Sequence, residues 1–538
     1  MPAESSAPAS ASAPSFAMVP QEVLEHIAFF AATDGMLGPP AGIVPLLTLN
    51  RTTHDALAFH NNPYLYARIF AEKYDTDAPA RRLGLAALPA TALAEELQRR
   101  SLVLKRIRAR TDSRAPDAAA DKHLGRILWT AFLMVLENDG RNERQLREYA
   151  RMHDWLREYL FDAHGASQVF QTIRVADRWI TETEQMSLAL WLFWYLLQPE
   201  DYLKNDALFR TVSGTLKVIA LGAHKYPSCY PDWVDFIPRG APHVPTVVKH
   251  YSSELRLVAP PAAPAAILAY LTLVNKLSAS LSTDHQNYQK PIVPQLDVDR
   301  TLHTSAERDC EWARLRNLAE PKILLRPTMA GAFTPGSLEG VWEGVFTYTE
   351  FTSYAGLLSG GPPSVLQRGL VAQHRQTIKV REWHFVAPEP DPDAPPPADP
   401  PRPLGPGNPS RGYVPDGIEI SEHSDRLEIL LAGNRRPVVY LSWAAVKKQG
   451  LQARVQDVFL TGEGHSAWGE FQLVGRVRPS DGYISLSKEY TDGDRGKWLY
   501  RAYMFGTTNG NLAGRWRDTL SPAHVDGYEG TWVACRRR

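Results

Sequence analysis

The sequence predicts an α+β fold in which helices occupy the amino-terminal and middle regions and an antiparallel β-barrel forms the carboxyl-terminal region. Two patterns carry this prediction. Up to about residue 330, apolar residues recur at the 3.6-residue spacing of amphipathic and buried helices. Beyond that point they alternate with polar residues, and turn-forming tracts separate the alternating runs, as in hairpins that close into a barrel.

Length and composition are those of a globular protein with several domains. The chain has 538 residues, of which 44% are hydrophobic and 22% charged. Lys plus Arg and Asp plus Glu are both 59, so the formal net charge is zero. Without a cationic excess we expect no nucleic-acid partner and no attraction to anionic membranes.

The ends of the chain and its cysteines indicate an intracellular setting. Residues 1–18, rich in Ala, Ser and Pro, are expected to form a disordered tail, and they lack the features of a signal peptide. Three scattered cysteines argue against a disulfide framework. The most apolar stretch, 265–274, is too short to span a bilayer. The expected location is the cytoplasm, the nucleus or both.

The helical part divides into a short amino-terminal module, residues 19–75, and a helical domain, residues 76–330. In the module, Val23, Leu24, Ile27 and Phe30 share one face of a helix. In the helical domain, residues 93–104 follow the same spacing, whereas 127–136 and 188–197 are apolar on nearly all sides. The last two are therefore expected to be buried helices.

The barrel is expected over residues 331–538, interrupted by a Pro-rich insertion at 387–415. Phe471, Leu473 and Val477 lie on one side of one run, and Trp498 and Tyr500 begin another. Proline supplies no backbone N–H, so the insertion is expected to be a solvated loop between strands.

Three segments of the amino-terminal module resemble an F-box, in the order in which the family has them. Segment 19–27 begins with Val19-Pro20 and continues as an apolar-faced helix, 43–51 carries paired leucines and looks like the second helix, and 62–70 contains Asn62-Pro63. Segments 97–108, 128–140 and 335–344 also resemble large F-box proteins of mushroom-forming fungi.

The F-box resemblance implies a substrate-receptor subunit of an SCF-type cullin–RING ubiquitin ligase. Such a subunit binds a Skp-type adaptor, and through it a cullin, and presents a client protein. The residues that would contact the adaptor, or form the core of the module itself, are Pro20, Val23, Leu24, Ile27, Leu46, Leu47 and Leu49. The alternative is that these helices only cap the larger helical region.

The carboxyl-terminal region resembles a calycin (lipocalin-like) barrel. Gly-x-Trp occurs at 340–342, 514–516 and 530–532. In such barrels a Trp of this motif near the first strand closes one end beneath an Arg of the last strand. The resemblance gives these parts to Trp342 and to one of Arg536, Arg537 and Arg538.

A closed barrel of about eight strands is either filled by side chains or holds one small ligand. Trp468, Tyr490 and Trp498 are therefore candidates for recognising a client or ligand. The alternative is that they fill the interior, as aromatic residues at two-residue spacing more often do.

Catalytic, phosphate-binding and metal-binding motifs are not found in the sequence. We expect no cofactor, no metal and no enzymatic activity. Two hypotheses follow: a non-catalytic ubiquitin-ligase receptor and, as the alternative, a small-ligand carrier on a helical scaffold. A third, an enzyme without a readable motif, has the least support.

Overall fold

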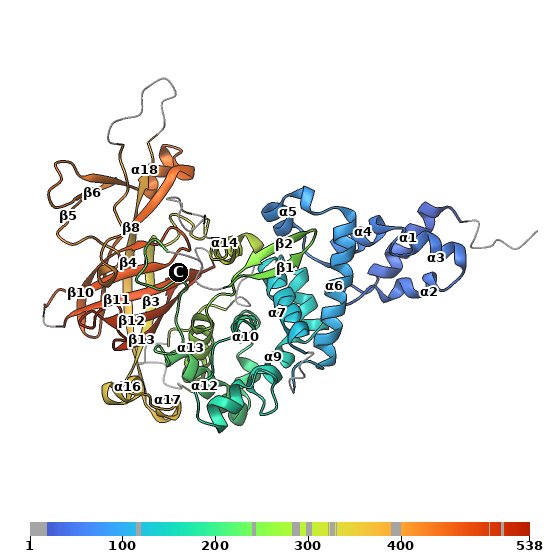
Figure 1. Ribbon diagram of the computed structural model, residues 1–538, viewed down its shortest axis with the longest axis horizontal. Helices are drawn as coiled ribbons and strands as arrows, with labels where there is room; N and C mark the ends of the chain where they lie inside the picture. Colours follow the sequence, from blue (N-terminus) through green and yellow to red (C-terminus); the bar gives the residue numbers. More distant parts are fainter. Residues whose placement is uncertain are drawn as a thin grey trace, which may run out of the picture.

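The computed structural model places helices in the amino-terminal and middle regions and a closed antiparallel barrel after them, which confirms the α+β class (Figure 1). It describes residues 19–114, 120–238, 244–281, 291–296, 304–320, 322, 329, 331–388, 400–493, 495–506 and 510–537. The expected tail, residues 1–18, and the 389–399 part of the Pro-rich insertion lie outside the described residues.

The amino-terminal module lies at the end of the molecule opposite the barrel (Figure 1). Its elements are α1 (Gln21–Thr33), η2 (Ala41–Ile43), α2 (Val44–Leu47), α3 (Arg51–Leu57) and α4 (Pro63–Lys73). The segment 43–51 is divided, because α2 ends at Leu47 and Asn50 starts a new helix by accepting the Thr53 N–H at 2.8 Å. Asn62 caps α4 in the same way.

Two buried side chains fasten the loop after α1 to the helices behind it. The Lys73 ammonium donates to the backbone carbonyls of Gly35 and Met36. The Gln145 side chain accepts the Gly38 N–H at 2.7 Å and donates to the Met36 carbonyl at 2.9 Å. Buried polar groups are tolerated when they are hydrogen-bonded, and these bonds join the module to the middle region.

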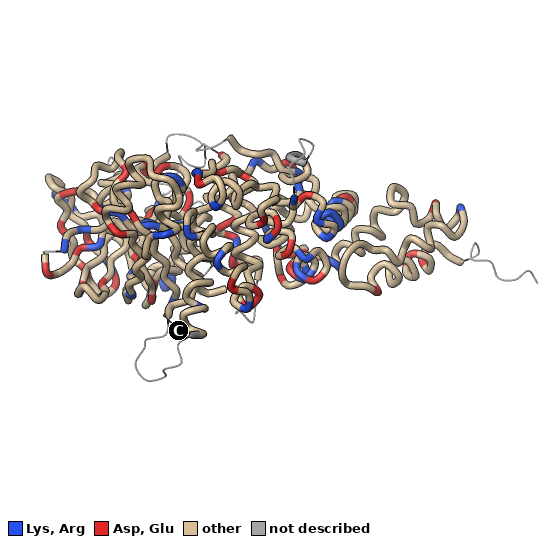
Figure 2. Tube along the Cα trace, turned by 90° about the horizontal axis from the view of Figure 1, so that it is seen from below, with Lys and Arg blue, Asp and Glu red and all other residues tan. Residues whose placement is uncertain are grey.

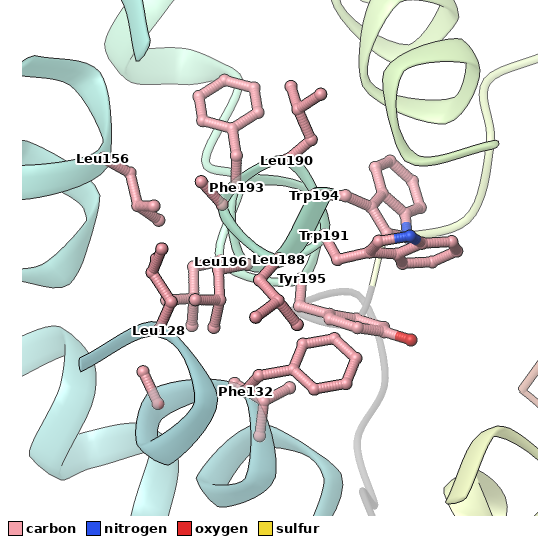
Figure 3. Packing of buried hydrophobic residues seen from close by; sticks show 14 of the residues in the cluster. Leu128, Phe132, Leu156, Leu188, Leu190, Trp191, Phe193, Trp194, Tyr195 and Leu196 are labelled. Carbon is pink, nitrogen blue, oxygen red and sulfur yellow. The ribbon is translucent and has the colours of Figure 1, made fainter. Parts of the chain in front are cut away.

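The middle region packs around α10 (Glu184–Tyr195), whose residues from Met186 onward are all buried. Leu128 and Phe132 of α7 and Leu156 of α9 lie against it (Figure 3). The other helices are α5 (Asp77–Leu83), α6 (Ala90–Ala109), α7 (Ala120–Leu136), α8 (Arg141–Arg144), α9 (Met152–Phe161), α11 (Glu200–Leu203), α12 (Asp206–Leu221), α13 (Ala262–Leu281) and α14 (Asp309–Asn317).

Residues 76–330 were expected to form an all-helical domain, and this is wrong for residues 246–257, which form two strands. β1 (Thr246–His250) and β2 (Ser253–Leu257) form an antiparallel hairpin. The β-branched run at its start favours a strand. The hairpin brings His250, which is buried, to a charged cluster between the helices.

This charged cluster consists of Glu96, Arg100, Glu137 and His250, all of them buried. Arg100 donates to Glu96 at 2.8 Å and to Glu137 at 2.7 Å. His250 Nε2 lies 2.5 Å from the other Glu137 oxygen. The cluster therefore joins α6, the end of α7 and the β1–β2 hairpin.

One described helix, α13, has a stretch, Ala262–Ser280, long and apolar enough to cross a membrane. The apolar stretch is longer than the 265–274 expected from the sequence, because the helix continues through Asn275, whose side chain donates to the Ile292 carbonyl at 2.7 Å. In the structure 72% of the stretch is buried, and the helix packs against α10 and α12.

In the described chain, eight strands form the closed ring, each hydrogen-bonded to its antiparallel neighbours in chain order. They are β3 (Gly340–Thr349), β4 (Val371–Val386), β8 (Val455–Ser466), β9 (Gly469–Val477), β10 (Ile484–Tyr490), β11 (Lys497–Phe505), β12 (Asn511–Asp518) and β13 (Glu529–Arg536). β13 pairs with β3 and closes the ring. Two short helices, α16 (Phe351–Leu358) and α17 (Ser364–Arg368), join β3 to β4.

Two of the Gly-x-Trp motifs pair with each other across β12 and β13. Gly514 lies opposite Trp532, and Trp516 lies opposite Gly530. A Cβ on Gly530 would lie 2.5 Å from the Trp516 ring, so only glycine leaves room for it. The Trp516 indole therefore covers a glycine that has no side chain to pack, an arrangement known to stabilise β-sheets.

The insertion between β4 and β8 is larger than the sequence indicated and spans residues 387–454. It contains β5 (Glu419–Glu422), β6 (Arg426–Leu430), β7 (Val438–Ser442) and α18 (Trp443–Lys448). The solvated loop expected at 387–415 is wrong for its second half, because Leu404, Tyr413 and Val414 are buried. Arg476 of β9 donates to the carbonyls of Leu404 and Tyr413, which satisfies backbone groups that no strand pairs.

One continuous apolar core runs from α1 through the middle region to the outer wall of the barrel. Trp191 of α10 packs on Phe505 of β11 with ring centroids 4.6 Å apart. Arg515 of β12 donates to the carbonyls of Ala220 and Tyr226, both at 2.8 Å. The helices therefore support the barrel directly.

Candidate functional site

The barrel has a cavity of about 260 Å³ at one end, which we call the aromatic pocket. Every side chain that lines it is aromatic: Phe346, Tyr348, Trp468, Tyr490, Trp498, Tyr500, Trp516 and Tyr528. The structure thus brings together Trp468, Tyr490 and Trp498, the three barrel residues singled out from the sequence. The other five were not, although Phe346 and Tyr348 show the same two-residue spacing.

Several polar groups of the pocket wall are hydrogen-bonded to other groups of the protein. The Trp498 indole N–H donates to the Arg495 carbonyl at 2.9 Å. The Tyr528 hydroxyl donates to the Thr349 carbonyl at 2.6 Å, and the Tyr490 hydroxyl lies 3.2 Å from the Ser466 hydroxyl. The wall therefore presents mainly ring faces and edges, which suit a flat apolar ligand.

Next to three of the lining rings, although not itself a lining residue, lies the amine of Lys488, which is 1% exposed. Its strand partner on β11 is Trp498. The Lys488 Nζ lies 4.8 Å from the Tyr490 ring centroid and 5.1 Å from that of Tyr500. It donates one hydrogen bond, to Gln376 Oε1 at 3.1 Å.

The charge of this amine is not neutralised by the described part of the chain. Burial alone lowers the pKa of Lys488 to about 7, with no carboxylate contributing to the shift. Ring faces attract a cation, and the Phe471 ring centroid lies 3.9 Å from Nζ. The amine is therefore poised between its charged and neutral forms near neutral pH.

The other end of the barrel is closed. Trp342 of β3 is fully buried and donates its indole N–H to the Leu338 carbonyl at 2.9 Å. Arg536 of β13 lies over the ring, with Cζ 4.9 Å from its centroid. The expected Trp–Arg contact is confirmed, with Arg536 as the arginine.

A second candidate site lies on the amino-terminal module. Val23, Ile27 and Phe30 form a stripe on α1 and are 47%, 39% and 65% exposed. Val44 and Leu49, on and after α2, are also exposed. We call these five residues the apolar patch. Figure 2 shows few charged residues on this module.

The predicted adaptor-contacting residues are placed differently from one another. Pro20, Val23, Ile27 and Leu49 are exposed, whereas Leu24 is buried in the core of the module. Leu46 and Leu47 are half-buried and pack against that core. Phe30 and Val44 were not among the candidates, although Phe30 lies seven residues after Val23 and therefore on the same helix face.

Within the described residues, no group of three or more His, Cys, Asp or Glu side chains could hold a metal ion. The three cysteines are all unpaired.

Comparison of the chain with protein-family models, with curated proteins and with solved structures found no match.

Proposed function

We propose that the chain is a substrate-receptor subunit of an SCF-type ubiquitin ligase, acting without bond-making residues of its own in the cytoplasm or nucleus. The observation that carries the proposal is the apolar patch, which lies on helices whose sequence segments resemble an F-box in their order. An exposed apolar surface of this kind is typical of a protein-binding site. Here the partner is a Skp-type adaptor and, through it, a cullin.

The position of the patch supports this role. It lies at the end of the molecule opposite the barrel (Figure 1), so the adaptor and a client would not compete for space. Holding a client near the charged ubiquitin carrier raises its effective concentration, and this proximity is the contribution of a receptor.

The barrel is the proposed client-binding part, and we assign it to the calycin-like type. Its eight antiparallel strands in chain order and its Trp342–Arg536 closure support the assignment.

The adaptor proposal is tested with the double substitution Ile27→Asp and Phe30→Asp in the full chain. Both side chains are exposed, so the helix should remain folded, while two charges enter the apolar patch. We expect affinity for a purified Skp-type adaptor, measured by titration calorimetry, to fall at least about tenfold.

The matched control is Leu370→Asp, since Leu370 is 90% exposed and lies on the barrel side of the molecule. It should bind the adaptor as the unaltered chain does. Adaptor binding that is absent in the unaltered chain, or unchanged in the folded double variant, would refute the proposal.

A second function, a small-ligand carrier, is favoured by the aromatic pocket itself. A barrel filled with side chains would have excluded a carrier function. The cavity of about 260 Å³ is compatible with it. It predicts that an uncharged flat compound, 2-naphthamide, quenches tryptophan fluorescence of the full chain in a saturable way, and the absence of quenching counts against it.

A further inference from the structure

Lys488 is buried among apolar side chains, where a charged amine lowers the stability of the folded state. A buried ammonium without an anion costs several kcal/mol unless its pKa falls. In the alternation of β10, Lys488 shares its face with Leu486 and Tyr490, both of which contribute to the apolar interior. An apolar side chain at this position would give a more stable barrel interior. The presence of an amine there is therefore better explained by ligand binding than by folding.

The pocket near the amine has a size and an aromatic lining that suit a ligand with a small aromatic ring system. Eight aromatic side chains line about 260 Å³, which is below the usual range for drug-sized ligands. Leu473, the strand partner of Lys488 on β9, and Leu486 are buried at the level of the amine. These two side chains occupy the apolar barrel interior next to the amine.

On the premise that the pocket is a ligand site, we propose that it binds an aromatic monocarboxylic acid of one or two rings, whose carboxylate pairs with the Lys488 ammonium. The ring system lies among the eight aromatic side chains. The carboxylate supplies the anion that the described chain does not, and a charge-assisted hydrogen bond in an apolar surrounding is stronger than one in water.

Other groups around the amine do not substitute for this anion. The Tyr490 and Tyr500 hydroxyls have pKa values raised by burial, so both are neutral at physiological pH. Gln376 offers a neutral oxygen. His374 stacks on Phe346 and Tyr348, with centroids 5.4 Å from each, and Arg495 lies close enough to act on Tyr490; both are basic side chains near this wall.

The test compares 2-naphthoic acid with 2-naphthamide, which has the same shape and no charge, by titration calorimetry on the full chain at pH 6.5. We expect the acid to bind at least about tenfold more tightly, the gain of a charge-assisted bond. In Lys488→Met the two compounds should bind equally, while the control Lys379→Met, at an exposed position on β4, should keep the difference.

The pH dependence gives an independent readout. Above pH 7 the amine of the free pocket is neutral, so binding of the acid must take up a proton, and its affinity should fall about tenfold per pH unit. Affinity for the amide should stay constant. The same profile in His374→Phe would assign the dependence to Lys488.

The possible results distinguish failure of the proposed ligand class from failure of the pocket as a binding site. Equal affinity for acid and amide in the unaltered chain, or a preference for the acid that survives in Lys488→Met, would overturn the ligand class but leave the pocket a binding site. Failure of both compounds to bind would overturn the ligand class together with the carrier function, and would leave the adaptor proposal untouched.

Discussion

At the residue scale, Lys488 places an amine in the barrel interior at a measurable energetic cost. Burial lowers its pKa to about 7 from the model-compound value of 10.5. Between these two pH values the unfolded chain binds more protons than the folded chain, so stability rises with pH through this window. Below pH 7 the full cost of burying the charge remains.

We therefore expect Lys488→Met to stabilise the ligand-free protein. The gain should be about 1–3 kcal/mol at pH 6, as when buried charges are replaced by apolar side chains. It should shrink towards pH 10, where the native lysine is already neutral. Urea unfolding at the two pH values measures this, and a variant less stable than the unaltered chain at pH 6 would show that ring faces and Gln376 fully offset the burial.

Lys488 also shows what sequence reasoning can and cannot find. Strict alternation in β10 puts it on the face of Leu486 and Tyr490, so its inward position was predictable. Its neighbours were not, because the contacts with Gln376 and the Tyr500 ring depend on the register of β4 and β11. Trp468, Tyr490 and Trp498 could be singled out as aromatic residues near loops, but only closure of the ring brings them to one cavity.

At the scale of elements, the periodicity predicted the buried helices α7 and α10 and the alternating strands β9 and β11. It did not predict the β1–β2 hairpin, because two five-residue strands give too short a pattern to separate from a loop. The buried half of the Pro-rich insertion was also missed, since Arg476 of β9, far along the chain, satisfies its carbonyls.

The charged cluster holds three elements together, and its carboxylate Glu137 yields a prediction. Burial acts to raise the pKa of Glu137, but His250 and Arg100 outweigh it and lower the pKa to about 2. Glu137→Gln removes the carboxylate that Arg100 and His250 share, leaving His250 without it and Arg100 with Glu96 alone. We expect a loss of about 3–5 kcal/mol at pH 7 in urea unfolding.

The sign of the pH dependence follows from the lowered pKa. The stability contributed by Glu137 is complete above pH 4.5 and is lost as pH falls towards 2, so the gap between the variant and the unaltered chain should narrow in this range. The control is Asp206→Asn, which breaks a surface pair with Arg210 and should cost under about 1 kcal/mol. Equal losses in the two variants would contradict the role of the cluster.

At the scale of the whole molecule, the continuous core predicts that helices and barrel unfold together. Trp191 against Phe505, and Arg515 on the carbonyls of α12 and the following loop, lose their partners if either part opens. Thermal unfolding followed by far-ultraviolet dichroism, which reports chiefly helices, should coincide with unfolding followed by tryptophan fluorescence. Two separated transitions would contradict a single cooperative unit.

In the described chain, the same core is continuous from the module that carries the apolar patch to the outer wall of the barrel. Lys73 and Gln145 lock the loop behind α1, and the barrel wall rests on α10 and α12. Two partners, one bound at the apolar patch and the other at the aromatic pocket, would thus be held at one distance and in one orientation. In the proposed role, an enzyme bound at the adaptor end could modify only those client residues that lie at this fixed distance from the barrel.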